Sequence, residues 1–93
     1  MDLDKIGKTI KWVRLYRGLS LDGVSAICGL SKCWLRLVER GSRPSKKAVY
    51  KICLALRILP SQLQTLADNP HTLTSRGNAF FTIAWILKEG GEK

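Results

Sequence analysis

The residues best suited to chemistry lie in one short segment, Ser31 to Arg40, where basic side chains alternate with apolar ones. Leu35 and Val38 recur at the spacing of one helical face, and they are the only two positions that a helix here would bury. The other side chains would face outward, with Trp34 on the flank: Lys32, Cys33, Arg36, Leu37 and Arg40. Because lysine and arginine combine positive charge with hydrogen-bond donors, this face is suited to binding a polyanion.

The charge of the whole chain favours the same kind of partner. Sixteen Lys and Arg residues against seven Asp and Glu residues give a formal net charge of +9 over 93 residues, with a sequence pI near 10. Between Lys5 and Arg57, thirteen basic residues stand against two acids, Asp22 and Glu39, so that this stretch alone carries +11. We therefore expect the partner-binding surface to lie in this stretch.

Other classes of protein have little support in the sequence. No paired carboxylates, nucleophile beside a base, metal-ligand cluster or glycine-rich phosphate loop indicates an enzyme, and we expect no cofactor and no metal. Cys28, Cys33 and Cys53 include no C-x-x-C pair, which fits reduced thiols in a cytoplasmic protein. We expect no secretory signal at the N-terminus and no membrane partner, because the longest apolar run, Ala79 to Leu87, is too short to span a bilayer.

Apolar spacing and capping residues predict the helices that must position the basic segment. Ser20 and Ser31 are placed to cap two short helices, and Gly29 is placed to close the first of them through a left-handed turn. We expect five helices: about Asp4 to Arg17, Leu21 to Cys28, Lys32 to Arg40, Lys46 to Leu56, and a short one that begins near Pro60. The fold class is therefore mainly all-α.

The chain changes character after Ala67, so we divide it into a helical domain, residues 1–67, and a linker with a C-terminal segment, residues 68–93. Ala79 to Leu87 is rich in aromatic and β-branched residues and is bounded by glycines, which favours a β-strand, with a helix as the open alternative. One small domain cannot easily bury so apolar a segment, and we expect it to form a homodimer interface. The expected interface residues are Phe80, Phe81, Ile83, Trp85, Ile86 and Leu87.

Two short helices joined by Gly29, Leu30 and Ser31, the second with a thin buried stripe, form the pattern of a helix-turn-helix. The stretch from Ile6 to Leu63 resembles the lambda Cro/repressor (Xre-like) family of five-helix DNA-binding domains. The matching residues are Ile6–Gly7, Ile10, Arg14, Gly18–Leu19–Ser20, Val24, Gly29–Leu30–Ser31, Leu35, Val38–Glu39–Arg40–Gly41 and Pro44–Ser45. The resemblance also implies that Arg14 pairs with Glu39 and so fixes the first helix against the third.

The resemblance implies that residues 1–67 bind double-stranded DNA, with the helix from Lys32 in the major groove. By analogy with the family, the base-reading residues are Lys32, Cys33, Arg36 and Leu37. Arg36 and Lys32 could contact the O6 and N7 acceptors of guanine, and Cys33 or Leu37 could contact a thymine methyl group. The expected phosphate-binding residues are Arg17, Ser20, Ser31, Trp34, Arg40, Arg43, Ser45, Lys46 and Lys47.

The family resemblance implies a sequence-specific transcriptional regulator, more often a repressor, that binds an inverted repeat as a homodimer. The short chain is typical of a phage or mobile-element regulator. An antitoxin is an alternative, and its C-terminal segment would hold a toxin or another regulatory protein. Leu21 stands where the family usually has Gln, and Trp34 stands where a small hydroxyl residue is usual. These two departures keep open a module of the same fold that binds a protein and not DNA.

Overall fold

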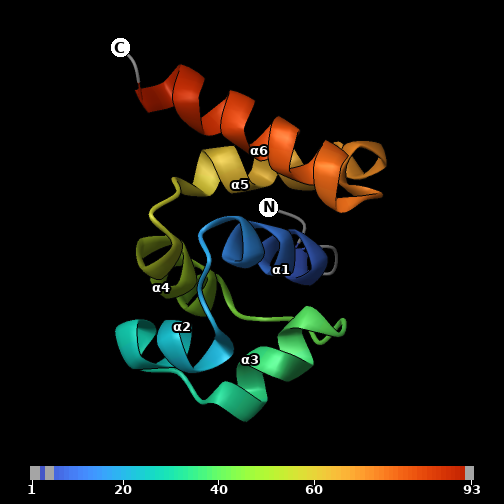
Figure 1. Cartoon of the computed structure of the whole chain (residues 1–93). Helices are drawn as coiled ribbons and strands as arrows, with labels where there is room; N and C mark the ends of the chain where they lie inside the picture. The colour runs from blue at the N-terminus through green and yellow to red at the C-terminus, as the bar shows by residue number, and fades with distance from the viewer. Residues whose placement is uncertain (1–2, 4–5, 92–93) are drawn as a thin grey trace.

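The structure is a computed structural model that describes residue 3 and residues 6–91 (Figure 1). Within these ranges the chain is helical and no residue lies in a β-strand, so the expected all-α class is confirmed. The helices are α1 (Ile6–Tyr16), α2 (Leu21–Cys28), α3 (Lys32–Glu39), α4 (Lys46–Leu56), α5 (Pro60–Ala67), the 3-10 helix η1 (Pro70–Leu73) and α6 (Arg76–Gly91). In this part of the chain, no helix combines the length and the apolar character that spanning a bilayer requires.

Helix α1 lies at the centre of the fold. Its residues Ile6, Ile10 and Val13 are at most 2% exposed, and the helix packs against α3, α5 and α6. Helix α4 connects the two ends of the molecule by packing against both α2 and α5, with Val49 and Ile52 fully buried. Each fully buried aliphatic side chain of this kind contributes about 1.5–3 kcal/mol to stability. Figure 1 shows the result, with α2 and α3 at one end of the molecule and α6 at the other.

Local capping signals set the bounds of α2 and α3. The Oγ atoms of Ser20 and Ser31 accept hydrogen bonds from the backbone N–H groups of Gly23 (3.0 Å) and Trp34 (3.3 Å). Gly29 follows α2 in the left-handed conformation, with φ of 75°, which costs glycine little because it has no Cβ. The predicted roles of these three capping residues are confirmed, and α2 and α3 are separated by three residues only.

The C-terminal segment is helical. Ala79 to Leu87 lies within α6, so the strand prediction is wrong. Ser75 caps the start of α6, because the Ser75 Oγ accepts a hydrogen bond from the N–H of Asn78 (3.3 Å). Ala79 and Ile83 are fully buried one turn apart, and α6 packs on α1 and α5. Burial of this helical stripe outweighs the strand propensity of aromatic and β-branched residues, since that propensity depends strongly on context.

Candidate nucleic-acid interface

Helix α3 presents one buried and one exposed face. Leu35 and Val38 are 2% and 0% exposed, whereas Leu37 on the other side is 51% exposed. The four expected base-reading residues come together on the outward side, which we call the α3 face: Lys32, Cys33, Arg36 and Leu37. Of these, Lys32 is half-buried and the other three are exposed. Trp34, expected on the flank, is half-buried and packs against the core, so its indole is only partly available to a partner.

An acidic residue that sequence reasoning did not assign lies beside the α3 face. The Nζ atom of Lys32 is 3.2 Å from Oδ2 of Asp22, which stands in the first turn of α2. The side chains of Lys32 and Asp22 are 43% and 75% exposed, so water screens the ion pair and it contributes little to stability. The ion pair orients the Lys32 side chain, because the ammonium group lies against the first turn of α2. The two residues stand ten positions apart in different helices, and their spacing gives no sequence signal for this contact.

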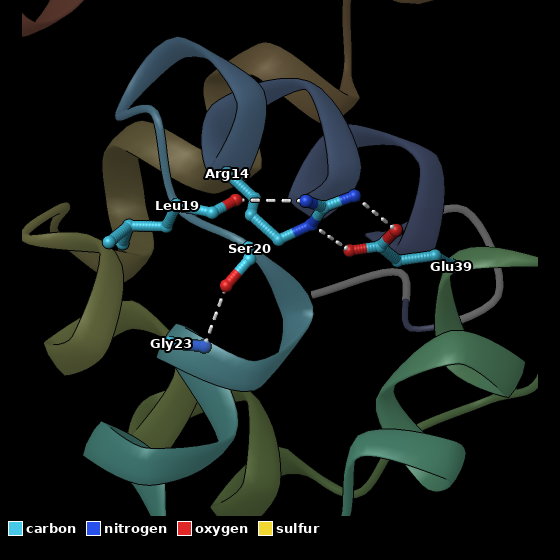
Figure 2. A network of polar contacts seen from close by, with 5 residues as sticks. All are labelled: Arg14, Leu19, Ser20, Gly23 and Glu39. Atoms are coloured by element: carbon cyan, nitrogen blue, oxygen red, sulfur yellow. Dashed lines mark hydrogen bonds and ion pairs between the residues drawn. The ribbon is translucent and has the colours of Figure 1, made fainter.

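One guanidinium group connects three parts of the fold (Figure 2). Arg14 donates from Nε to Oε2 of Glu39 (2.7 Å) and from Nη2 to Oε1 (3.1 Å), which confirms the pairing implied by the family resemblance. Its Nη1 donates to the carbonyl of Leu19 (2.9 Å), the residue directly before the α2 cap Ser20. The side chain of Arg14 therefore fixes the last turn of α3 and the entry to α2 with respect to α1.

The close approach of α1 and α3 requires a glycine. A Cβ atom on Gly7 would fall 1.9 Å from the carbonyl oxygen of Val38, far inside van der Waals contact. The obstacle is backbone, so it cannot move aside as a side chain could. Gly7 lets α3 sit against α1 closely enough for Arg14 to reach Glu39 with two hydrogen bonds.

Three exposed serines mark the N-termini of the helices around the α3 face. Ser20, Ser31 and Ser45 cap α2, α3 and α4, each through an Oγ that accepts a backbone N–H. An accepting hydroxyl still has its own proton to donate, and helix N-termini attract anions. The basic residues from the end of α3 to the first turn of α4 are exposed: Arg40, Arg43, Lys46 and Lys47. The first turn of α4 contains no acid, so its two lysines lie where the helix dipole disfavours cations.

Arg17, expected to bind phosphate, makes hydrogen bonds within the chain. Its Nε donates to the carbonyl of Leu56 (2.8 Å) and its Nη2 to the carbonyl of Arg57 (2.8 Å), so that it caps the C-terminus of α4. Positive charge is favourable at this end of a helix. Because α4 has eleven residues, this end lies roughly 16 Å from the lysines of the first turn. The structure therefore places Arg17 in a helix cap and away from the expected phosphate contacts.

Most apolar side chains of α6 are buried or half-buried against other helices of the same chain. Ile83 is fully buried, and Phe80 meets the rings of Trp12 and Tyr16 edge to face, with centroids 6.4 and 5.6 Å apart. Ile86 and Leu87 are half-buried against the core. Of the six residues expected at a dimer interface, Phe81 and Trp85 are exposed, at 75% and 62%. They stand one helical turn apart, and α6 lies at the opposite end of the molecule from α3 (Figure 1).

Comparisons of the chain with protein-family models, with curated proteins and with solved structures find no match. The function of the interface is therefore inferred from its own shape and charge. The interface consists of the exposed basic face of α3 with its own capped N-terminus, the capped N-termini of α2 and α4, and four exposed cations.

Proposed function

We propose that this protein is a sequence-specific DNA-binding regulator of transcription of the helix-turn-helix type, similar in design to the Cro/repressor family and acting as a repressor. The observation that carries the proposal is the α3 face: an exposed, basic helical surface held rigidly by the contact of Arg14 with Glu39. A rigid scaffold matters because base recognition depends on placing donors accurately against base edges.

In the proposed complex, α3 enters the major groove, which is wide enough for one α-helix. Arg36, exposed in the middle of the α3 face, is placed to donate two hydrogen bonds to guanine O6 and N7. Lys32 leaves Asp22 to reach the same class of acceptor, and Leu37 contacts a thymine methyl group. The preferred half-site then contains at least one guanine.

Contacts to phosphates hold the protein in register but carry little sequence information. The capped N-termini of α2 and α4 supply backbone N–H groups and serine hydroxyls for this purpose. Arg40, Lys46 and Lys47 supply charge, and each contacted phosphate adds about 0.9 to the salt slope of binding.

We further propose that the protein binds DNA as a homodimer through Phe81 and Trp85. With the segment helical, two chains would pair by packing α6 against its copy, not by strand pairing. An antitoxin-type role is the second candidate, and one observation favours it. The exposed aromatic pair lies at the opposite end from the α3 face, so a partner protein could occupy it while DNA is bound.

The test is selection of bound sequences from a random duplex pool at two salt concentrations, with wild type, Arg36→Ala and Arg57→Gly. The Arg57 variant is the matched control, because it removes one positive charge at the far end of α4, from an exposed residue with positive φ. We expect an enriched inverted repeat for wild type and for the control. Arg36→Ala should lose preference at one base pair per half-site, at a cost of about 1–3 kcal/mol. Binding with no enriched sequence would reject specific recognition, and absence of binding would favour a protein-interaction module.

A further inference from the structure

A second basic surface lies outside the α3 face. A pocket of about 710 Å³ opens where one face of α1, from Gly7 to Leu15, meets the end of α3 and the start of α6. The start of α1, the end of α3 and the start of α6 lie on the same side of the molecule in Figure 1. The volume falls in the range of pockets that hold small organic ligands, about 300–1,000 Å³.

Four cations from three helices line this pocket: Lys8 and Lys11 of α1, Arg40 at the end of α3, and Arg76 of α6. Among the residues that the structure describes, the one acid in the lining is Glu39, and both of its carboxylate oxygens are already bonded to Arg14. Its negative charge is therefore balanced by a residue outside the lining. The pocket is left with a local excess of positive charge.

The spacing of these cations favours the binding of an anion. Lys8 and Lys11 stand three residues apart on α1, a spacing at which like charges repel. Lys8 also lies in the first turn of α1, where the helix dipole disfavours a cation and no acid stands nearby in that turn. An anion with more than one negative charge would relieve both effects at once.

The lining also has an apolar side, supplied by Trp12 and Leu15. The Trp12 ring is held by its edge-to-face contact with Phe80, so it offers a preorganised aromatic surface. Guanidinium groups bind phosphate in a fork geometry, and ammonium groups bind it as point charges. A phosphate with an aromatic body attached fits this combination of groups.

We propose that the pocket binds the phosphate group of a nucleotide. The phosphate belongs either to a nucleotide free in solution, whose base lies against Trp12, or to the backbone of a DNA duplex that runs past the end of α3, where Arg40 is exposed and no base contact is made. The site shares Arg40 with the proposed phosphate contacts but contains none of the four residues of the α3 face, and it does not require that the protein select a DNA sequence.

The experiment uses the full chain with adenosine 5′-monophosphate and with inorganic phosphate as probes, at constant ionic strength set by chloride. Calorimetric titration gives the affinity, and the thermal midpoint gives a second readout. The test variant is Lys11→Ser with Arg76→Ser, both exposed residues. The control is Lys51→Ser with Arg57→Gly, which removes the same charge from exposed residues outside the lining.

For a free nucleotide, we expect saturable binding of adenosine 5′-monophosphate that raises the thermal midpoint. Affinity should fall at least about ten-fold in the test variant and stay within about two-fold in the control. If the phosphate belongs to DNA, the free probes do not bind saturably. The salt slope of duplex binding then falls by about 0.9 or more in the test variant only.

The proposal is overturned if neither probe binds saturably and the duplex salt slope of the test variant equals that of the control. Binding of the probes equally by both variants would also overturn it, since that result indicates unspecific attraction to a basic protein. The free-nucleotide arm does not involve DNA, so its outcome is independent of whether the α3 face selects a sequence.

Discussion

Arg14 and Glu39 form a two-bond ion pair, with a shortest distance of 2.7 Å, and their side chains are only 12% and 9% exposed. The pair joins α1 to the last turn of α3, and Arg14 also bonds to the Leu19 carbonyl at the entry to α2. Removing water from two charges is costly, so a pair this enclosed is most sensitive to loss of one partner. The position of the α3 face therefore depends on this contact.

Replacing Glu39 by Ala should lower the free energy of unfolding by about 3 kcal/mol, because it leaves the Arg14 guanidinium enclosed without its partner. Urea denaturation of wild type, both single variants and the Arg14→Ala/Glu39→Ala double variant would measure the loss and the coupling energy. We expect the double variant to lose much less than the sum of the two single losses. Simple additivity would mean that the two side chains do not interact in solution.

The helices that carry the interface were predictable because their signals are local. The ranges of α2 and α4 agree with the sequence expectation, since a serine cap starts each helix and the apolar spacing defines its length. The positions of Leu35 and Val38 gave the outward face of α3 in the same way. The contact of Arg14 with Glu39 was accessible only through the family resemblance, because nothing in the spacing of the two residues indicates it.

Features that depend on tertiary packing were not predictable. The strand expectation for Ala79 to Leu87 failed because one stripe of α6 is buried by packing on α1 and α5, which the residues of the segment itself do not reveal. The contact of Lys32 with Asp22 and the capping of α4 by Arg17 also depend on how separate helices pack. In each case a residue's chemistry was clear from the sequence, and its partner was not.

Gly7→Ala should destabilise the protein by about 1–3 kcal/mol or more, because its methyl group would press into the Val38 carbonyl. Thermal unfolding followed by circular dichroism would measure the change. Gly77→Ala is the matched control, since a Cβ at this helical glycine meets nothing within 4 Å. We expect the control to be neutral or slightly stabilising. Equal stability of the two variants would contradict the close packing of α1 against α3.

Substitutions of Arg17 and Lys47 should have different effects, because Arg17 stabilises the fold and Lys47 is proposed to bind phosphate. Arg17→Ala should lower the free energy of unfolding by about 1.5 kcal/mol through loss of its bonds to α4, with an unchanged salt slope of DNA binding. Lys47→Ala should leave stability unchanged and reduce the salt slope by about 0.9. Duplex binding measured at several salt concentrations distinguishes them. A reduced slope for Arg17→Ala would restore Arg17 to the phosphate-binding set.

Two of the three cysteines, Cys33 and Cys53, should differ in reactivity. Burial raises the pKa of the Cys53 thiol from 9.0 to about 11, whereas Cys33 on the α3 face is exposed. At pH 8 we expect a thiol reagent to label Cys33 in the folded protein and to label Cys53 only after unfolding. Labelling of both at the same rate would show that the structure around Cys53 opens readily.

The raised pKa of Cys53 also predicts a pH dependence. The folded state holds the thiol proton more tightly than the unfolded state, so this contribution to stability is complete below pH 9 and is lost as the pH rises through 11. The stability difference between wild type and Cys53→Ala should therefore shrink between pH 9 and 11. Urea denaturation at pH 9 and at pH 11 measures this difference. A difference that grows with pH would contradict a raised pKa for Cys53 in the folded protein.

Phe81 and Trp85 should decide whether the protein pairs with its own copy. Both are largely exposed and lie one turn apart on α6, and truncation of large aromatic residues at the centre of an interface typically costs 2 kcal/mol or more, about 30-fold in affinity. We expect wild type to sediment as a dimer at micromolar concentration and Phe81→Ser/Trp85→Ser as a monomer. Leu54→Ser on α4 is the control, because Leu54 is 81% exposed and apolar but distant from α6 in the chain. A wild-type monomer would reject self-association, and the aromatic pair would then favour the antitoxin-type alternative, in which a different protein covers α6 while the α3 face remains on DNA.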